Sequence, residues 1–188
     1  MQRLIALLFA AGFAGFACAA DEAAQLDAAR KVASAIPPKL LAVLSEEIAK
    51  GGPENAIAVC RDKAPKMAAG ASAESGWAIR RVSLKNRNPK AVPDAWERAV
   101  LEEFDQRKAA GENPAKLEKG ALVEEAGVKV YRYMKALPTQ ELCLSCHGMP
   151  EHITPAVKAK LGELYPGDKA VGYSVGDIRG AITLKRPL

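Results

Sequence analysis

The chain has 188 residues, of which 49% are hydrophobic, and this is enough to build one domain with a sizeable apolar core. Its formal charge is +5, but the basic excess is spread along the sequence and aromatic residues make up only 5%. The spread of charge and the few aromatic residues exclude a basic surface that binds nucleic acid. The length leaves no room for a kinase or cyclase domain in addition to one sensing domain.

The first twenty residues have the features of a secretory signal peptide. A charged start is followed by a nearly unbroken apolar run over residues 4–17, and small residues then precede Asp21. This order is typical of a cleaved export signal, and the apolar run is too short to span a bilayer comfortably. We therefore expect residues 1–20 to be removed and residues 21–188 to form one periplasmic domain with no transmembrane segment. A lipid anchor on Cys18 is the alternative, but the residues before it fit a lipoprotein signal poorly.

Two helices are predicted next. Apolar residues recur at steps of three and four over residues 21–50, where Pro37-Pro38 should break or kink the helix. Gly51-Gly52 should stop it, and a second helix is expected over residues 53–67. Cys60 lies on the apolar stripe of that second helix.

Strands and helices alternate in the rest of the chain. Asp94, with Glu97 three residues later, predicts a capping box at the start of a third helix, and Thr154-Pro155 should start another. Strand propensity is concentrated in residues 77–84, 121–125, 127–134 and 178–184. Helices first, then strands interleaved with helices, indicate an α+β fold.

The most informative segment is Cys143-Leu144-Ser145-Cys146-His147, the attachment signature of a c-type haem. Two thiols at this spacing can form thioethers with one porphyrin, and the adjacent imidazole then reaches the iron. A thioredoxin-like dithiol would need a strand before the motif, and a zinc site would need a second ligand pair. The sequence offers neither, since its only other histidine is His152. We expect one haem c, attached through Cys143 and Cys146 and ligated by His147.

The residue opposite His147 is less certain from the residues alone. Haem attachment and signal removal would leave Cys60 as the single remaining cysteine, either as an axial ligand or as an inert buried residue. Met149 and His152 follow His147 too closely to reach the other haem face.

Arginines are the natural partners of the haem propionates, because guanidinium groups pair well with carboxylates. The candidates are Arg80, Arg81, Arg87 and Arg179. An exposed salt bridge is the alternative interpretation of each.

Several further stretches, which follow one another along nearly the whole mature chain, match the sequence pattern of a known family. They are residues 56–60, 80–89, 93–97, 143–148, 165–168 and 176–182. With them the chain resembles a bacterial family of exported c-type haem proteins, long described as a domain of unknown function. Ala91-Val92 departs from the family's pattern. The resemblance implies a PAS-like antiparallel sheet flanked by helices, and implies that the cysteine matching Cys60 binds the iron opposite His147.

Together these features favour a periplasmic haem protein in redox response or low-potential electron transfer, with a separate redox or signalling protein as its partner. One alternative is a sensor in which a diatomic gas displaces Cys60. Another is a haem enzyme such as a peroxidase, but this would need an open iron site and a distal acid–base residue. A non-enzymatic role is therefore favoured.

Overall fold

The computed structural model describes residues 14–188, with side-chain exposure from residue 21 onward. The described strands form one antiparallel sheet in the order β1-β4-β3-β2. They are β1 (Ala78–Val82), β2 (Glu118–Glu125), β3 (Val128–Pro138) and β4 (Ile178–Pro187). The main helices are α1 (Ala14–Ala58), α2 (Ala64–Ser75), α3 (Ala95–Ala109), α4 (Glu141–His147) and α5 (Pro155–Leu164). Short turns are η1 (Val59–Lys63), η2 (Pro89–Ala91), η3 (Pro114–Lys116) and η4 (Pro150–His152). The α+β prediction is confirmed.

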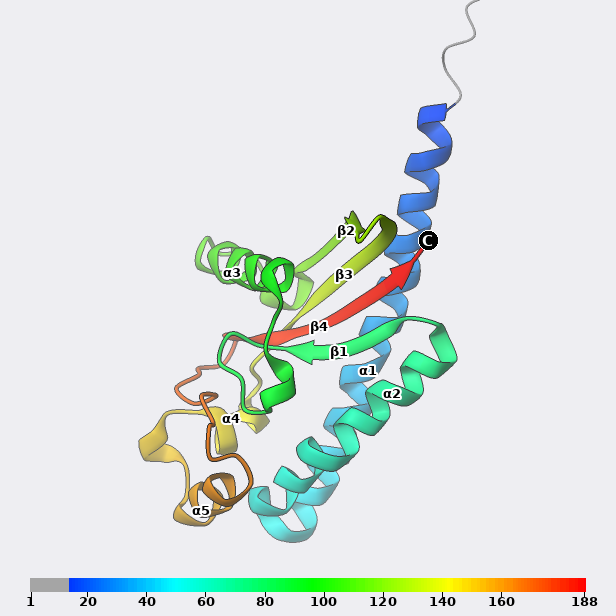
Figure 1. The fold of residues 1–188 in the computed structure, drawn as a ribbon. Helices are drawn as coiled ribbons and strands as arrows, with labels where there is room; N and C mark the ends of the chain where they lie inside the picture. The colour runs from blue at the N-terminus through cyan, green and yellow to red at the C-terminus, as the bar shows by residue number, and fades with distance from the viewer. Residues whose placement is uncertain (1–13) are drawn as a thin grey trace, which may run out of the picture.

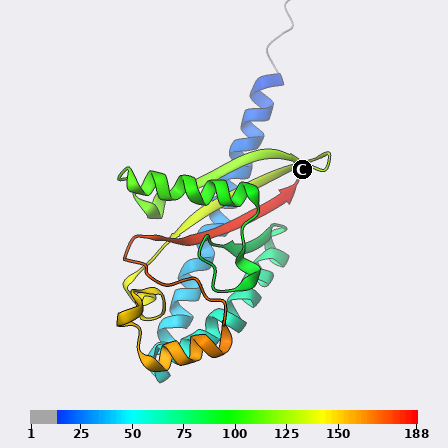
Figure 2. The same cartoon turned by 60° about the vertical axis from the view of Figure 1, so that its left-hand side comes forward.

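The sheet is covered by helices on both faces (Figures 1 and 2). On one face α3 contributes Val100, Leu101 and Phe104 to a core cluster with Val82 and Met134. On the other face α1 packs against the strands. That second cluster contains Ala29, Ala33, Trp77, Tyr131, Tyr133, Ile182 and Leu184. Strand alternation, which sends successive side chains to opposite faces, separates the two clusters.

A helical hairpin forms the second face. α1 runs down the sheet and α2 returns beside it (Figure 1). The backbone leaves helical geometry at Gly51 and Gly52, where the φ of Gly52 is +78°, so the predicted glycine stop is observed. The break predicted at Pro37-Pro38 is wrong, because helical geometry continues through both prolines.

A third core cluster lies at the end of the molecule away from the sheet. Ile57, near the end of α1, packs there with Val157, Leu161 and Tyr165, and Cys146 lies against them. This cluster joins the α1–α2 hairpin to α4 and α5 (Figure 1). The chain region that contains Cys60 is therefore held next to the Cys143–His147 motif.

Several elements are longer than predicted. The helix after Gly52 extends past Met67 to Ser75, because four of the eight added residues are alanine, a strong helix former. β3 extends to Pro138 and β4 to Pro187, since each pairs with the other almost to its end. The pairing partner is a tertiary feature that local propensity does not show.

The predicted signal peptide falls largely on residues 1–13, outside the described part of the chain, and residues 14–20 belong to α1. Among the helices described here, none combines the length and apolar character needed to cross a membrane.

Candidate functional site

The Cys-x-x-Cys-His motif lies on its own short helix, α4, which begins three residues after β3 ends at Pro138, so the expectation that no strand precedes the motif is wrong. The backbone N–H of Gln140 contacts the Sγ of Cys143 at 3.5 Å. Cys60, Cys143 and Cys146 are all free and half-buried. Gly148 ends the helix, and a Cβ there would lie 2.7 Å from the carbonyl oxygen of Leu144. A glycine is therefore needed directly after the motif for this helix end.

One short hydrogen bond fixes the imidazole of His147. Its Nδ1 lies 2.7 Å from the carbonyl oxygen of Ala170. A carbonyl can only accept, so Nδ1 carries the proton and Nε2 keeps the lone pair that a metal requires. Burial lowers the pKa of His147 well below its usual range, and the nearby charges of Arg179 and Arg87 lower it further. The ring is therefore neutral, the form in which histidine ligates metals.

Arg179 also approaches this imidazole, with its Nε 3.2 Å from the same Nδ1. A protonated Nδ1 cannot accept from it, so we assign the Nδ1 proton to the shorter Ala170 bond. Arg179 is instead held by Ser83, whose Oγ accepts from its guanidinium at 3.0 Å. Burial lowers the pKa of Arg179 to about 9, which leaves it charged at neutral pH.

The segment over residues 168–173 ties α4 to the rest of the domain. The N–H of Tyr173 donates to the carbonyl of His147 at 3.0 Å, and the phenol ring of Tyr173 packs edge-on against the imidazole of His147. Arg87 pairs with Asp168 at 2.9 Å and donates to the carbonyl of Cys146 at 2.5 Å. The role of Arg87 in this structure is to hold the motif in place.

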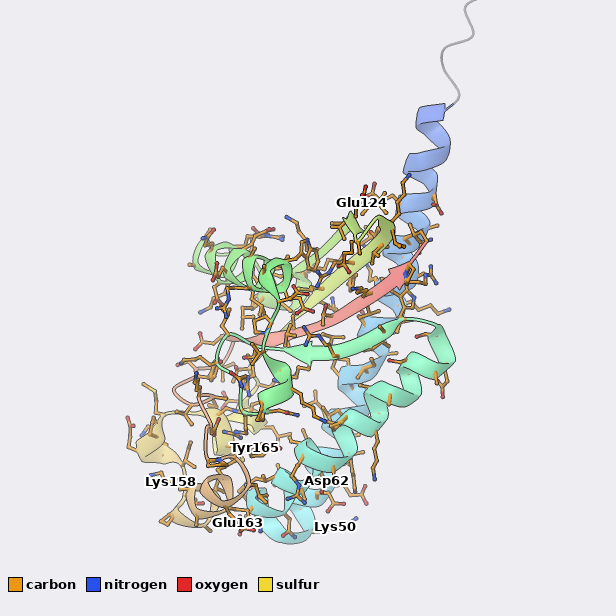
Figure 3. All side chains as sticks on the ribbon, viewed as in Figure 1. Lys50, Asp62, Glu124, Lys158, Glu163 and Tyr165 are labelled. Carbon is orange, nitrogen blue, oxygen red and sulfur yellow. The ribbon has the colours of Figure 1, made fainter. Side chains whose placement is uncertain are left out.

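Cys60 lies in the same environment. Burial raises the pKa of its thiol, while the positive charges of Arg81, Arg87 and Arg179 act to lower it, and Cys143 is close enough to contribute. Burial raises the pKa of Tyr165, the residue directly after α5 that is labelled in Figure 3, and a charge on Cys60 would raise it further. The fold thus gathers Cys60 with the motif, although the two are more than eighty residues apart in the chain.

Arg81 is the cation at this site without a partner. It forms no hydrogen bond or ion pair with any described residue, whereas Arg87 and Arg179 both bond to protein groups. Burial of its guanidinium lowers the pKa of Arg81, yet the residue as a whole is exposed to solvent.

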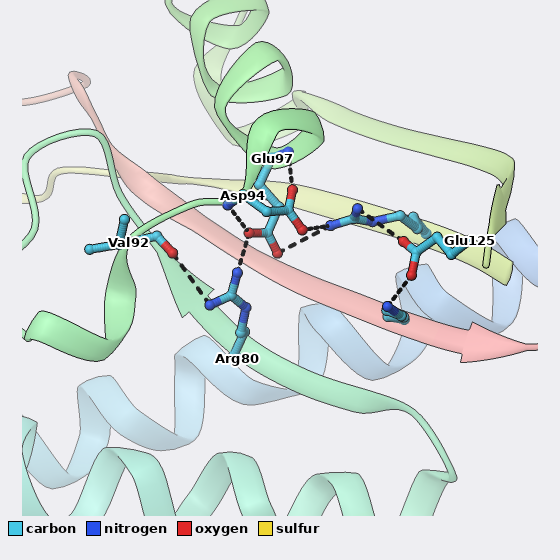
Figure 4. Close-up of polar contacts among 7 residues, drawn as sticks. Arg80, Val92, Asp94, Glu97 and Glu125 are labelled. Atoms are coloured by element: carbon cyan, nitrogen blue, oxygen red, sulfur yellow. Dashed lines mark hydrogen bonds and ion pairs between the residues drawn. The ribbon is translucent and has the colours of Figure 1, made fainter.

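Arg80 is not brought to this cluster. It lies on the α3 face of the sheet, where it pairs with Glu97 and approaches the carbonyl of Val92 (Figure 4). Glu97 and Asp94 form the predicted capping box of α3 and also pair with Arg132. Arg80 thus belongs to an ion network that fixes the start of α3.

Sequence reasoning missed several residues that organise the site. Ala170 contributes only a backbone carbonyl, which no side-chain pattern can reveal. Asp168 lies inside a stretch that carried the resemblance, but nothing in that stretch predicts its ion pair with Arg87. Ser83, with its buried hydroxyl on Arg179, lies inside a stretch that carried the resemblance. No three His, Cys, Asp or Glu side chains form a metal-binding group within the described residues.

Comparison with known proteins places this site in a family. The chain is similar to the solved crystal structure of the cyanobacterial heme-protein Tll0287, with 29% sequence identity and a TM-score of 0.54. The similarity covers 66% of this chain and 70% of that one. No curated protein matches. The family described as Tll0287-like matches residues 19–187. Because this match spans nearly the whole sequence, the chain belongs to the Tll0287-like family.

Proposed function

We propose that this protein binds one haem c through thioethers to Cys143 and Cys146, with His147 and Cys60 as the axial ligands. The observation that carries the proposal is the Nδ1 hydrogen bond of His147 to Ala170, next to two free thiols at haem-attachment spacing. The similar solved structure, which is described as a heme-protein, supports the same cofactor.

The chemistry of the surrounding residues fits this group. His147 presents a neutral imidazole, and Cys60 provides a thiol within the same cluster. Arg81 has no partner and suits a propionate carboxylate. Arg87 and Arg179 add positive charge but are already bonded to protein, so we assign propionate binding first to Arg81.

The proposed role is redox response or low-potential electron transfer in the periplasm, in exchange with a partner protein. The haem would supply a one-electron couple. The thiolate of Cys60 would favour the ferric state, because an anionic ligand stabilises the higher charge on iron. The four-stranded antiparallel sheet with helices on both faces agrees with the PAS-like fold that we propose for the domain.

Haem attachment is tested by expressing the full chain with the cytochrome c maturation system and staining for haem after denaturing electrophoresis. We expect a stained band for the natural sequence and none for the Cys143→Ser/Cys146→Ser double variant. An unstained natural chain would overturn covalent attachment.

Cys60 ligation is tested in the stained protein by ferric absorption spectra and a redox titration. Cys60→Ser should remove the thiolate features and raise the midpoint potential. An unchanged spectrum and potential would assign Cys60 to the buried core instead. Adding CO to the reduced protein distinguishes the sensor role, since a CO complex requires that Cys60 leave the iron.

A further inference from the structure

Cys60 lies in an unusual turn of helix. η1 (Val59–Lys63) is a π-helical turn between α1 and α2, and its hydrogen bond joins the N–H of Ala64 to the carbonyl of Val59. This bond spans five residues, whereas an α-helix would pair Ala64 with the carbonyl of Cys60. The turn therefore contains one residue more than an α-helical turn, and the extra residue is accommodated around Cys60.

Pro65 explains why the π turn lies at this position. It has no N–H, so the α-helical bond to the carbonyl of Arg61 cannot form, and its ring would collide with that carbonyl. A π turn directly before the proline moves this carbonyl away from the ring. The next π-helical bond, from residue 65 to Cys60, is also impossible, so the wide turn cannot extend toward α2.

The helical arm that returns after Gly52 is fixed on both sides of this turn. Ile57, before the turn, is packed in the third core cluster, and the Oγ of Ser72 in α2, after the turn, accepts from the N–H of Ile79 in β1 at 3.0 Å. The extra residue therefore cannot be expelled by rotating one side of the turn against the other. It can only move along the helix, and Pro65 blocks its movement toward α2.

We propose that Pro65 is a positioning residue, which pins the π turn at Cys60 and so directs the thiol toward the side of the site opposite His147. This inference deepens the function proposed above and rests on Cys60 being an iron ligand. Pro65 itself touches neither the haem nor the reacting atoms. It acts only through the backbone of residues 59–64.

The test restores the missing N–H with Pro65→Ala, and with Pro65→Ser as a second variant that makes the same backbone change. Pro38→Ala is the matched control, because it removes a proline from the interior of α1 in a stretch that shows no π turn. In haem-loaded protein, both Pro65 variants should lose part of the thiolate absorption of the ferric state and gain faster CO binding after reduction. Pro38→Ala should match the natural sequence in both measurements.

A second measurement needs no haem. In the Cys143→Ser/Cys146→Ser background, Cys60 is the reporter thiol, and its alkylation rate should rise in the Pro65 variants because the thiol is no longer held in one position. Removing a helix-interior proline normally stabilises a helix, so a purely structural role predicts unchanged spectra and an unchanged or slower alkylation rate.

The outcomes separate the two proposals. If Cys60→Ser loses the thiolate signature while both Pro65 variants keep it, the positioning role is wrong and the ligand assignment stands. If Cys60→Ser keeps the natural ferric spectrum, the ligand assignment is wrong and the positioning role is overturned with it.

Discussion

The imidazole of His147 shows how a backbone atom can prepare a metal ligand. The carbonyl of Ala170 orients the ring and fixes its tautomer, and burial, together with the positive charge of Arg179 and Arg87, keeps the ring neutral. Arg179 then places a guanidinium next to a ring that carries no charge of its own. The ligand is thus ready for iron without a change in its protonation.

Two neighbouring arginines allow a matched test of the site. We expect Arg81→Gln to lower the midpoint potential of the haem-loaded protein, because it removes a partly buried positive charge that favours uptake of an electron. Arg80→Gln should leave the potential unchanged, since Arg80 pairs with Glu97 on the α3 face. A redox titration of both variants checks this. Equal potentials in Arg81→Gln and the natural sequence would remove Arg81 from the haem environment.

Element positions explain which parts of the site could be predicted from the sequence. Residues 80 and 81 are adjacent in β1, so they point to opposite faces of the sheet, and only one of them can reach a site on a given face. Successive residues of a strand alternate between its two faces, so Arg80 shares a face with Val82 and Arg81 lies on the opposite face. Once Val82 is placed in the core cluster under α3, this alternation assigns Arg80 to the α3 face. The capping box at Asp94 and the end of the first helix at Gly51-Gly52 were predictable because their signals are local. The π turn and the Ala170 bond depend on tertiary packing.

The pairing of β4 with the end of β1 depends on Gly180, directly after Arg179. Its φ is +145°, and a Cβ there would lie 2.3 Å from the carbonyl oxygen of Val82. We expect Gly180→Ala to destabilise the fold by roughly 1–3 kcal/mol, because the backbone must shift or adopt a strained conformation. Urea unfolding measures this. Gly167→Ala is the control, since nothing lies within 4 Å of a Cβ at that position.

At the scale of the whole molecule, ion pairs add to the apolar clusters in joining the helices to the sheet. Arg30 of α1 pairs with Glu118 of β2, and Lys108 of α3 pairs with Asp177, just before β4. Glu118 also accepts from the buried hydroxyl of Tyr133 at 2.6 Å. These carboxylates are half-buried, so their pairing contributes more to stability than the exposed pairs elsewhere on the surface.

This arrangement predicts how stability depends on pH. The hydrogen bond from Arg30 lowers the pKa of Glu118 below its usual 4.5 in the folded state. The unfolded chain then binds more protons at low pH, so the stabilisation is present above about pH 4.5 and is lost as the pH falls through the folded pKa. We expect Glu118→Gln to lower the free energy of unfolding by about 1 kcal/mol at pH 7. Between about pH 5 and about pH 3, the range in which carboxyl groups titrate, the variant should lose less unfolding free energy than the natural sequence.

Urea unfolding of the natural sequence and of Glu118→Gln at a series of pH values checks this. Glu112→Gln is the control. Arg107 also lowers the pKa of Glu112, but this pair lies on the exposed surface, where solvent screens it, so its removal should change the pH dependence less. The same acid dependence in Glu118→Gln and in the natural sequence would show that other groups cause the loss of stability. A flatter curve in Glu118→Gln than in Glu112→Gln would assign the acid-sensitive part of the stability to the Arg30–Glu118 pair between α1 and β2. Since α1 leads directly into η1 and Cys60, acid release of α1 would also loosen the proposed axial ligand.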